Sequence, residues 1–347
     1  MVNKRESNLE LLRIVSIILI IMHHFALYTE LNFGNYITSN RLIIQFLTIG
    51  GKAGACCFLL ISGYFMINQK FKLKKFIKLI LQLLTYCILG FVLSIIVNGA
   101  HYSLLNALQL LFLSIFGSYW FMLPYLIVYI LSPFINKAFN CFNKNELKKL
   151  IILLILLQSF FPTFSFLNFE FSNVIWFITL YIIGAYFSRF KEAIPNKKTS
   201  IILLISSYLV SFLLVLGIDF LKNITYVRFN TFYFASVNSP FTLIISVSLF
   251  LFFIKIKVFY NKFINIIASS TLGIYLFHDN TFFKHFMWDN LAYLLNINTN
   301  TSYLFLKAIV SILIVFVCGF IVELIRKNTL ERITNKVIDK FLLSKKE

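Results

Sequence analysis

Three ionisable residues, Glu10, Arg13 and His24, lie in the first apolar run of the chain. A charge at the centre of a bilayer costs roughly 2.5–3.5 kcal/mol on insertion, so ionisable residues in such a run are candidates for function. Arg13 and His24 are eleven positions apart, which returns to within about 20° of the same helix face after a rise of about 16 Å. The spacing predicts a polar stripe with a cation that can stabilise negative charge and an imidazole that can accept a proton.

Each of these residues also has a structural interpretation. His24 could be a packing histidine that bonds a neighbouring helix, because buried polar side chains usually find a partner. Glu10 and Arg13, three positions apart, could form an interfacial ion pair at a helix end. A shared face favours a polar cavity over these alternatives. His23 is expected to point about 80° away from that face.

A second polar cluster, His278, Asp279 and Asn280, follows a later apolar run. A carboxylate next to an imidazole can set its tautomer and charge, and the alternative is a helix cap at the water surface. Trp120 opens another run, where an interfacial aromatic belt is the ordinary interpretation.

Five lysines form a basic segment between the second and third apolar runs: Lys70, Lys72, Lys74, Lys75 and Lys78. Such a segment usually sets membrane topology and contacts anionic lipid. Lysine is also a point charge for phosphate, so the segment could hold the phosphates of a cytosolic donor.

The composition indicates the setting in which these residues act. Of 347 residues, 59% are hydrophobic and 13% are charged, whereas soluble domains carry about 25% charged residues. Apolar runs of about 20 residues can span a bilayer as helices. We therefore predict an all-α integral membrane protein with one domain over residues 1–347 and about ten transmembrane helices. The predicted spans are 9–28, 47–67, 76–97, 119–138, 150–166, 174–187, 201–221, 241–256, 263–277 and 303–325.

Ten spans place both termini on one side of the membrane, and the basic residues indicate which side. With the N-terminus inside, most of the 32 lysines and arginines fall in inner segments. The outer segments and the outer ends of the helices hold only Arg41, Lys52, Lys222, Arg228, Lys284 and Lys307. This asymmetry predicts cytoplasmic termini. The apolar stretch Leu104–Phe116 is too short to span, and we predict a re-entrant or interfacial segment there.

Several classes of protein and site are disfavoured. The net charge of +19 lies in short loops between apolar runs, which indicates topology rather than nucleic-acid binding. The five cysteines form no C-x-x-C pattern, so neither a disulfide framework nor a metal site is supported. No Gly-x-Ser-x-Gly, glycine-rich phosphate loop or His-Glu-x-x-His occurs, which leaves histidine as the expected general base of an enzyme. No permanently bound cofactor is expected.

The ordered motifs resemble a known family. Arg13, ten intervening residues and His24 in the first of ten spans resemble the acyltransferase 3 family of membrane-bound acyltransferases. Further resemblance lies in residues 51–65, 119–121 and 176–186, and in residues 273–280, which are similar to a helix ending in members that modify capsular or exported polysaccharide. Many members carry Arg-x-x-Arg where this chain has Lys75 and Lys78, which keep the charge and lose the bidentate fork.

The resemblance implies an O-acyltransferase in a bacterial plasma or inner membrane. It would move an acetyl group from cytosolic acetyl-CoA to a hydroxyl of a cell-surface polysaccharide or a lipid-linked saccharide precursor. His24 and Arg13 are then the predicted catalytic residues, and an acyl-histidine intermediate is compatible with the sequence. The predicted donor side comprises Glu10, Lys75 and Lys78, and the acceptor side comprises Trp120, His278, Asp279 and Asn280.

Two other classes remain open at this point. A transporter or flippase of a lipid-linked sugar or small solute also suits ten spans with polar residues, although the corresponding broken helices typical of transporters are absent from the sequence. A non-enzymatic assembly partner would tolerate replacement of Arg13 and His24.

Overall fold

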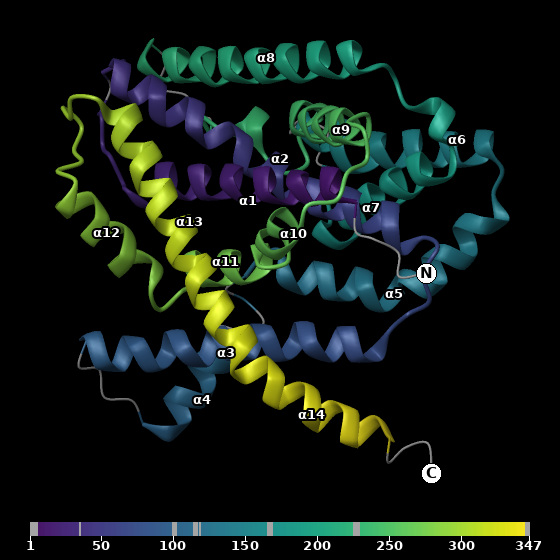
Figure 1. The fold of residues 1–347 in the computed structure, drawn as a ribbon. Coiled ribbons are helices and arrows are strands. Elements are labelled where there is room, and N and C mark those ends of the chain that lie inside the picture. Colours follow the sequence, from purple (N-terminus) through teal and green to yellow (C-terminus); the bar gives the residue numbers. More distant parts are fainter. Residues whose placement is uncertain are drawn as a thin grey trace.

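A computed structural model describes residues 6–34, 36–98, 103–113, 117, 119–164, 169–224 and 230–343 (Figure 1). Within these ranges the chain forms helices and no strand. The α-helices are α1 Ser7–Tyr28, α2 Ser39–Met66, α3 Leu73–Asn98, α4 Leu104–Leu113, α5 Met122–Cys141, α6 Lys144–Ile155, α7 Asn173–Arg189, α8 Lys197–Ile224, α9 Pro240–Ile254, α10 Lys262–Ala268, α11 Thr271–His278, α12 Lys284–Leu294, α13 Leu304–Asn328 and α14 Leu330–Leu343. Short π or 3₁₀ segments occupy Leu156–Phe160, Phe161–Thr163, Lys191–Ala193 and Tyr233–Ala235.

Seven helical segments in the described ranges are long and apolar enough to cross a membrane. They contain α1, α2, α3, α5, α8, α9, and α13 together with α14. The other three predicted spans fall on shorter or interrupted elements: α6 with its π segment, α7, and α10 with α11. The chain is therefore an all-helical, multi-pass membrane protein, while ten spans and cytoplasmic termini stay predictions. The described part of Leu104–Phe116 is α4, which has 10 residues and is too short to span.

Helix α1 occupies the centre of the bundle, and α8 runs along its periphery (Figure 1). The difference follows from their side chains. Leu12 and Ile17 of α1 are fully buried, whereas Ile205 and Leu213 of α8 are 61% and 56% exposed. Lipid can cover such an apolar helix surface, but water would penalise it. The position of α1 places the predicted polar stripe inside the protein rather than against lipid.

Glycines of α2 allow this helix to pack closely on α1. A Cβ atom built on Gly51 would lie 2.2 Å from the Cβ atom of His23, and one on Gly54 would lie 2.5 Å from the carbonyl oxygen of Ser16. Both distances are far shorter than van der Waals contact, so neither position accepts a larger residue without a shift of the helices. This close approach brings the residue after Gly51, which is Lys52, next to the histidines of α1.

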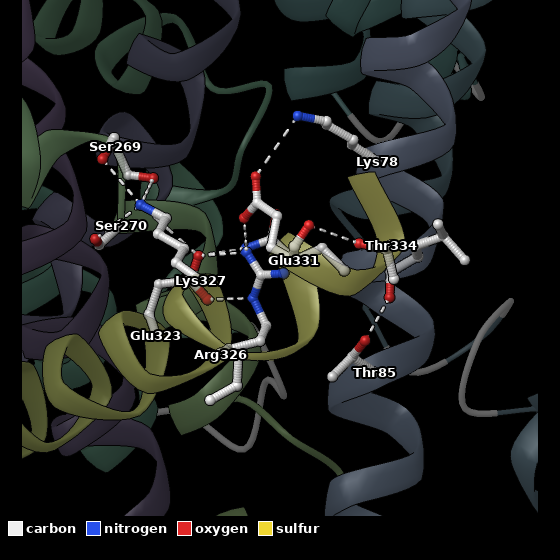
Figure 2. Close-up of polar contacts among 12 residues, drawn as sticks. Lys78, Thr85, Ser269, Ser270, Glu323, Arg326, Lys327, Glu331 and Thr334 are labelled. Atoms are coloured by element: carbon white, nitrogen blue, oxygen red, sulfur yellow. Dashed lines mark hydrogen bonds and ion pairs between the residues drawn. The ribbon is translucent and has the colours of Figure 1, made fainter. Parts of the chain in front are cut away.

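The predicted span 263–277 is divided into α10 and α11 at Ser269 and Ser270. Lys327, near the end of α13, forms hydrogen bonds with the residues between the two helices, as Figure 2 shows. Its ammonium donates to the Ser269 carbonyl oxygen at 2.8 Å and to the Ser270 hydroxyl at 3.0 Å. A cation at the end of a helix satisfies a carbonyl that has no partner within the helix. The interaction fixes the start of α11, which carries His278 at its other end.

Candidate active site

A cavity of about 820 Å³ runs beside α1. Its wall includes Glu10 and Arg13 from the first half of α1 and His23 and His24 from the second half. The rise of a helix places Glu10 and His24 about 21 Å apart along the axis, compared with about 30 Å for the hydrocarbon core. One continuous cavity therefore connects the two ends of the polar stripe that the sequence predicts.

His24 contacts His278 across the interface between α1 and α11. The Nδ1 atom of His24 lies 2.9 Å from the Nε2 atom of His278. The Nδ1 atom of His278 lies 2.6 Å from the carbonyl oxygen of Ile274. A carbonyl oxygen only accepts, so His278 carries its hydrogen on Nδ1, and its Nε2 accepts from His24 when both rings are neutral. No described residue donates to or accepts from Nε2 of His24, and this nitrogen keeps its lone pair.

His23 also lines the cavity, although the helical wheel predicts that it points away from His24. Its Nδ1 atom lies 2.7 Å from the carbonyl oxygen of Thr48 on α2, so this nitrogen donates. The adjacent histidines therefore bond different helices: His23 bonds α2, and His24 bonds α11.

The predicted pairing of Glu10 with Arg13 is present, with 3.8 Å between the carboxylate Oε2 and the guanidinium Nε. Both residues line the cavity, and the side chain of Glu10 is only 9% exposed. Within the described part of the chain, neither of these two atoms has a hydrogen-bond partner. A buried polar atom without a partner costs about 1–3 kcal/mol. The ion pair at this end of the cavity is therefore not fully satisfied by hydrogen bonds.

The two lysines of the predicted donor side differ in the pockets that they line: Lys75 lines the large cavity and a smaller pocket, and Lys78 lines the smaller pocket alone. Lys75 lines the cavity, and its ammonium lies 5.6 Å from the ring centroid of Tyr129. The smaller pocket has a volume of about 90 Å³, and there the ammonium of Lys78 is 3.8 Å from the carboxylate of Glu331 on α14. Of this pair, Lys75 is the one placed to meet a ligand in the large cavity.

Trp120 and Lys52 lie together on the cavity wall near the histidines. The ammonium of Lys52 stands 4.3 Å from the centroid of the Trp120 ring. This geometry is a cation–π interaction, which holds a charged group beside an aromatic face. Lys52 is absent from the predicted site residues. Its position inside the predicted span 47–67, where a charge is costly, is the sequence signal that identifies it.

The cluster after Phe277 lies behind the cavity wall. His278, Asp279 and Asn280 are buried and do not line the cavity. Asp279 accepts a hydrogen bond of 2.7 Å from the hydroxyl of Tyr28, at the end of α1. The side-chain amide of Asn280 donates to the carbonyl oxygen of Tyr86 on α3 at 2.8 Å. These bonds attach the end of α11 to α1 and α3, and so hold His278 against His24.

Comparison with known proteins gives one match. A family model described as an acyltransferase domain matches residues 6–321. No curated protein and no solved structure matches the chain. The matched region begins just before α1 and ends within α13, and it contains the whole cavity wall. Because this family model covers nearly the entire sequence, the chain belongs to the acyltransferase 3 family.

Proposed function

We propose that the protein is an O-acyltransferase that moves an acetyl group from acetyl-CoA to a hydroxyl of a surface polysaccharide or a lipid-linked saccharide. The observation that carries this proposal is one cavity whose wall includes His24, Lys52 and Arg13. Acyl transfer to a hydroxyl uses a base for the hydroxyl proton and a cation close to it for the developing negative charge, and His24 and Lys52 suit these roles.

In the proposed reaction, Nε2 of His24 removes the proton of the acceptor hydroxyl. At the same time, the oxygen of this hydroxyl attacks the carbonyl carbon of the thioester. The tetrahedral intermediate collapses, the C–S bond breaks, and the CoA thiolate takes the proton from His24. In a two-step variant, Nε2 itself attacks the thioester and the hydroxyl then attacks the acyl-imidazole. Both routes use the same lone pair and balance in atoms and charge.

Arg13 and Lys52 take different roles in this scheme. Arg13 lies about 16 Å from His24 along α1, too far to contact an oxyanion formed beside the imidazole. In this proposal Arg13 and Lys75 instead bind the phosphates of CoA, and the long pantetheine arm extends along the cavity towards His24. Lys52 lies beside the histidines and suits the negative charge that develops on the thioester oxygen.

The test is the O-acetyl content of the surface polysaccharide, measured by proton NMR in a host whose own copy is deleted. Wild type, His24→Ala and Arg13→Ala are compared at matched protein levels in the membrane. Loss of the acetyl signal in both variants is the expected result. An unchanged signal with normal protein levels contradicts polysaccharide acetylation.

A cavity beside a helix long and apolar enough to span a membrane also suits a transporter, and donor binding distinguishes the two functions. We expect the purified protein to bind acetyl-CoA in isothermal titration calorimetry and to release CoA when acceptor membranes are added. A transporter of saccharides has no need of either property, so absence of both would favour transport.

A further inference from the structure

We infer that His278 is a positioning residue, which holds His24 in the tautomer that presents a basic Nε2 atom to the cavity. The inference rests on the proposed function, in which His24 is the base or nucleophile. It differs from the sequence-based expectation that His278 contacts the acceptor.

The first argument is burial. His278 is 0% exposed and lies outside the residues that line the cavity. Both of its ring nitrogens are already engaged, Nδ1 with the Ile274 carbonyl oxygen and Nε2 with His24. A side chain with no exposed surface and no remaining polar atom cannot bind a saccharide hydroxyl, but it can orient a neighbour.

The second argument is the order of donors and acceptors. The Ile274 carbonyl lies one helical turn before His278 on α11, and it forces the hydrogen of His278 onto Nδ1. Nε2 of His278 is therefore an acceptor, and only the Nδ1–H tautomer of His24 satisfies it. A fixed backbone carbonyl thus determines which nitrogen of His24 is basic.

The third argument concerns the charged state. When Nε2 of His24 takes a proton, the ring becomes an imidazolium whose Nδ1–H still donates to His278 at the same position. Hydrogen bonds from charged donors are stronger than those between neutral groups. The pair therefore stabilises the protonated intermediate without any movement of either ring.

Two substitutions separate positioning from other roles. His278→Gln places an amide near the position of Nε2 that can accept from His24 but cannot take up a proton. His278→Leu removes the acceptor and keeps a side chain of similar size. His285→Gln is the matched control, because His285 lies on α12 with a side chain that is 56% exposed.

Activity is CoA release from acetyl-CoA by host membranes that carry the acceptor. We expect His278→Leu to lower kcat by about 10²–10⁴-fold, the contribution of a correctly placed base, with little change in the KM for acetyl-CoA. His278→Gln should recover most of this loss, and His285→Gln should match wild type. Equal loss in the Gln and Leu variants would overturn positioning, since orientation alone would then be insufficient.

A second readout does not depend on turnover. The protein has five histidines, so a ¹⁵N NMR spectrum of histidine-labelled protein is simple, and the His24→Gln variant assigns its signals. In wild type, we expect His24 to be protonated on Nδ1 and unprotonated on Nε2. In His278→Leu, we expect His24 to lose its preference for this tautomer. Protonation on Nε2 in wild type overturns the inference even if the Leu variant does not fold. A normal kcat in His278→Leu with an inactive His24→Ala overturns positioning alone, whereas activity in His24→Ala overturns the proposed role of His24.

Discussion

Glu323 and Arg326 form a buried bidentate ion pair near the end of α13 (Figure 2). The guanidinium Nε and Nη2 atoms lie 2.7 and 2.9 Å from the two carboxylate oxygens, and Glu323 is 0% exposed. The carboxylate also accepts from the hydroxyl of Tyr86 at 2.8 Å and the amide of Gln82 at 3.0 Å, both on α3. The Nη2 atom of Arg326 also donates to the carboxylate Oε2 atom of Glu331 on α14 at 2.7 Å. A buried charge with every oxygen bonded links α3, α13 and α14 at one point.

We predict that Glu323→Ala destabilises the protein, because it leaves Arg326 with Glu331 as its remaining carboxylate partner and removes the acceptor of Tyr86 and Gln82 on α3. Removal of one member of a buried pair costs about 3–5 kcal/mol. Thermal unfolding in detergent, followed by tryptophan fluorescence, measures the change. The double variant Glu323→Leu with Arg326→Met removes both charges and should recover much of the loss. Equal stability of wild type and Glu323→Ala would show that the pair contributes no net stability.

A second prediction concerns the crossing of α2 and α7. A Cβ atom on Gly63 would lie 1.9 Å from the carbonyl oxygen of Tyr181, and one on Gly184 would lie 2.1 Å from that of Leu60. Gly63→Ala must therefore push the two helices apart, and overpacking of this kind costs about 1–3 kcal/mol. The yield of monodisperse protein and the unfolding temperature should both fall.

The matched control for this crossing is Gly217→Ala. A Cβ atom there meets nothing within 4 Å, and Gly217 lies inside α8. Alanine has a higher helix propensity by about 1 kcal/mol, so this variant should be as stable as wild type or slightly more stable. Similar destabilisation by both substitutions would contradict the packing argument.

The long helices follow closely from the sequence. The predicted span 9–28 corresponds to α1 at Ser7–Tyr28, and 303–325 corresponds to α13 at Leu304–Asn328. Continuous apolar character defines such helices without help from the rest of the fold. The interruption of 263–277 is different, because Lys327 stabilises it from 58 positions further along the chain. A contact of that range leaves no local signal in the residues at the break.

The site residues likewise divide into those that the sequence of one helix predicts and those whose positions depend on contacts between helices. The helical period alone places Arg13 and His24 on one cavity, since both lie on the same helix. The position of Lys52 depends on how closely α2 approaches α1 at Gly51, and the position of His278 depends on how α11 is attached. The packing of one helix on another determines where Lys52 and His278 lie relative to α1. The sequence pattern of a single helix therefore does not predict these positions.

A third prediction tests the charge of Lys52. Lys52→Met should lower kcat for acetyl transfer by about 10²–10³-fold, the effect of removing one group that stabilises an oxyanion. The Kd for acetyl-CoA should change little, because the phosphates are expected at the other end of the cavity. Lys52→Arg keeps the charge near Trp120 and should retain part of the activity. A large loss of acetyl-CoA binding with unchanged kcat would assign Lys52 to the donor instead.

The last prediction distinguishes the two lysines of α3. Both lysines line the smaller pocket, but only Lys75 also lines the large cavity, and Lys78 lies 3.8 Å from Glu331 on α14. A hydrogen bond to a charged group contributes about 1.5–3 kcal/mol, so Lys75→Met should raise the Kd for CoA by about 10- to 100-fold. Lys78→Met should leave this Kd nearly unchanged and act instead on the attachment of α14. Isothermal titration calorimetry with CoA measures the first effect, and the rate of proteolysis within α14 measures the second. If Lys78→Met weakened CoA binding as much as Lys75→Met, the smaller pocket would have to be part of the donor site.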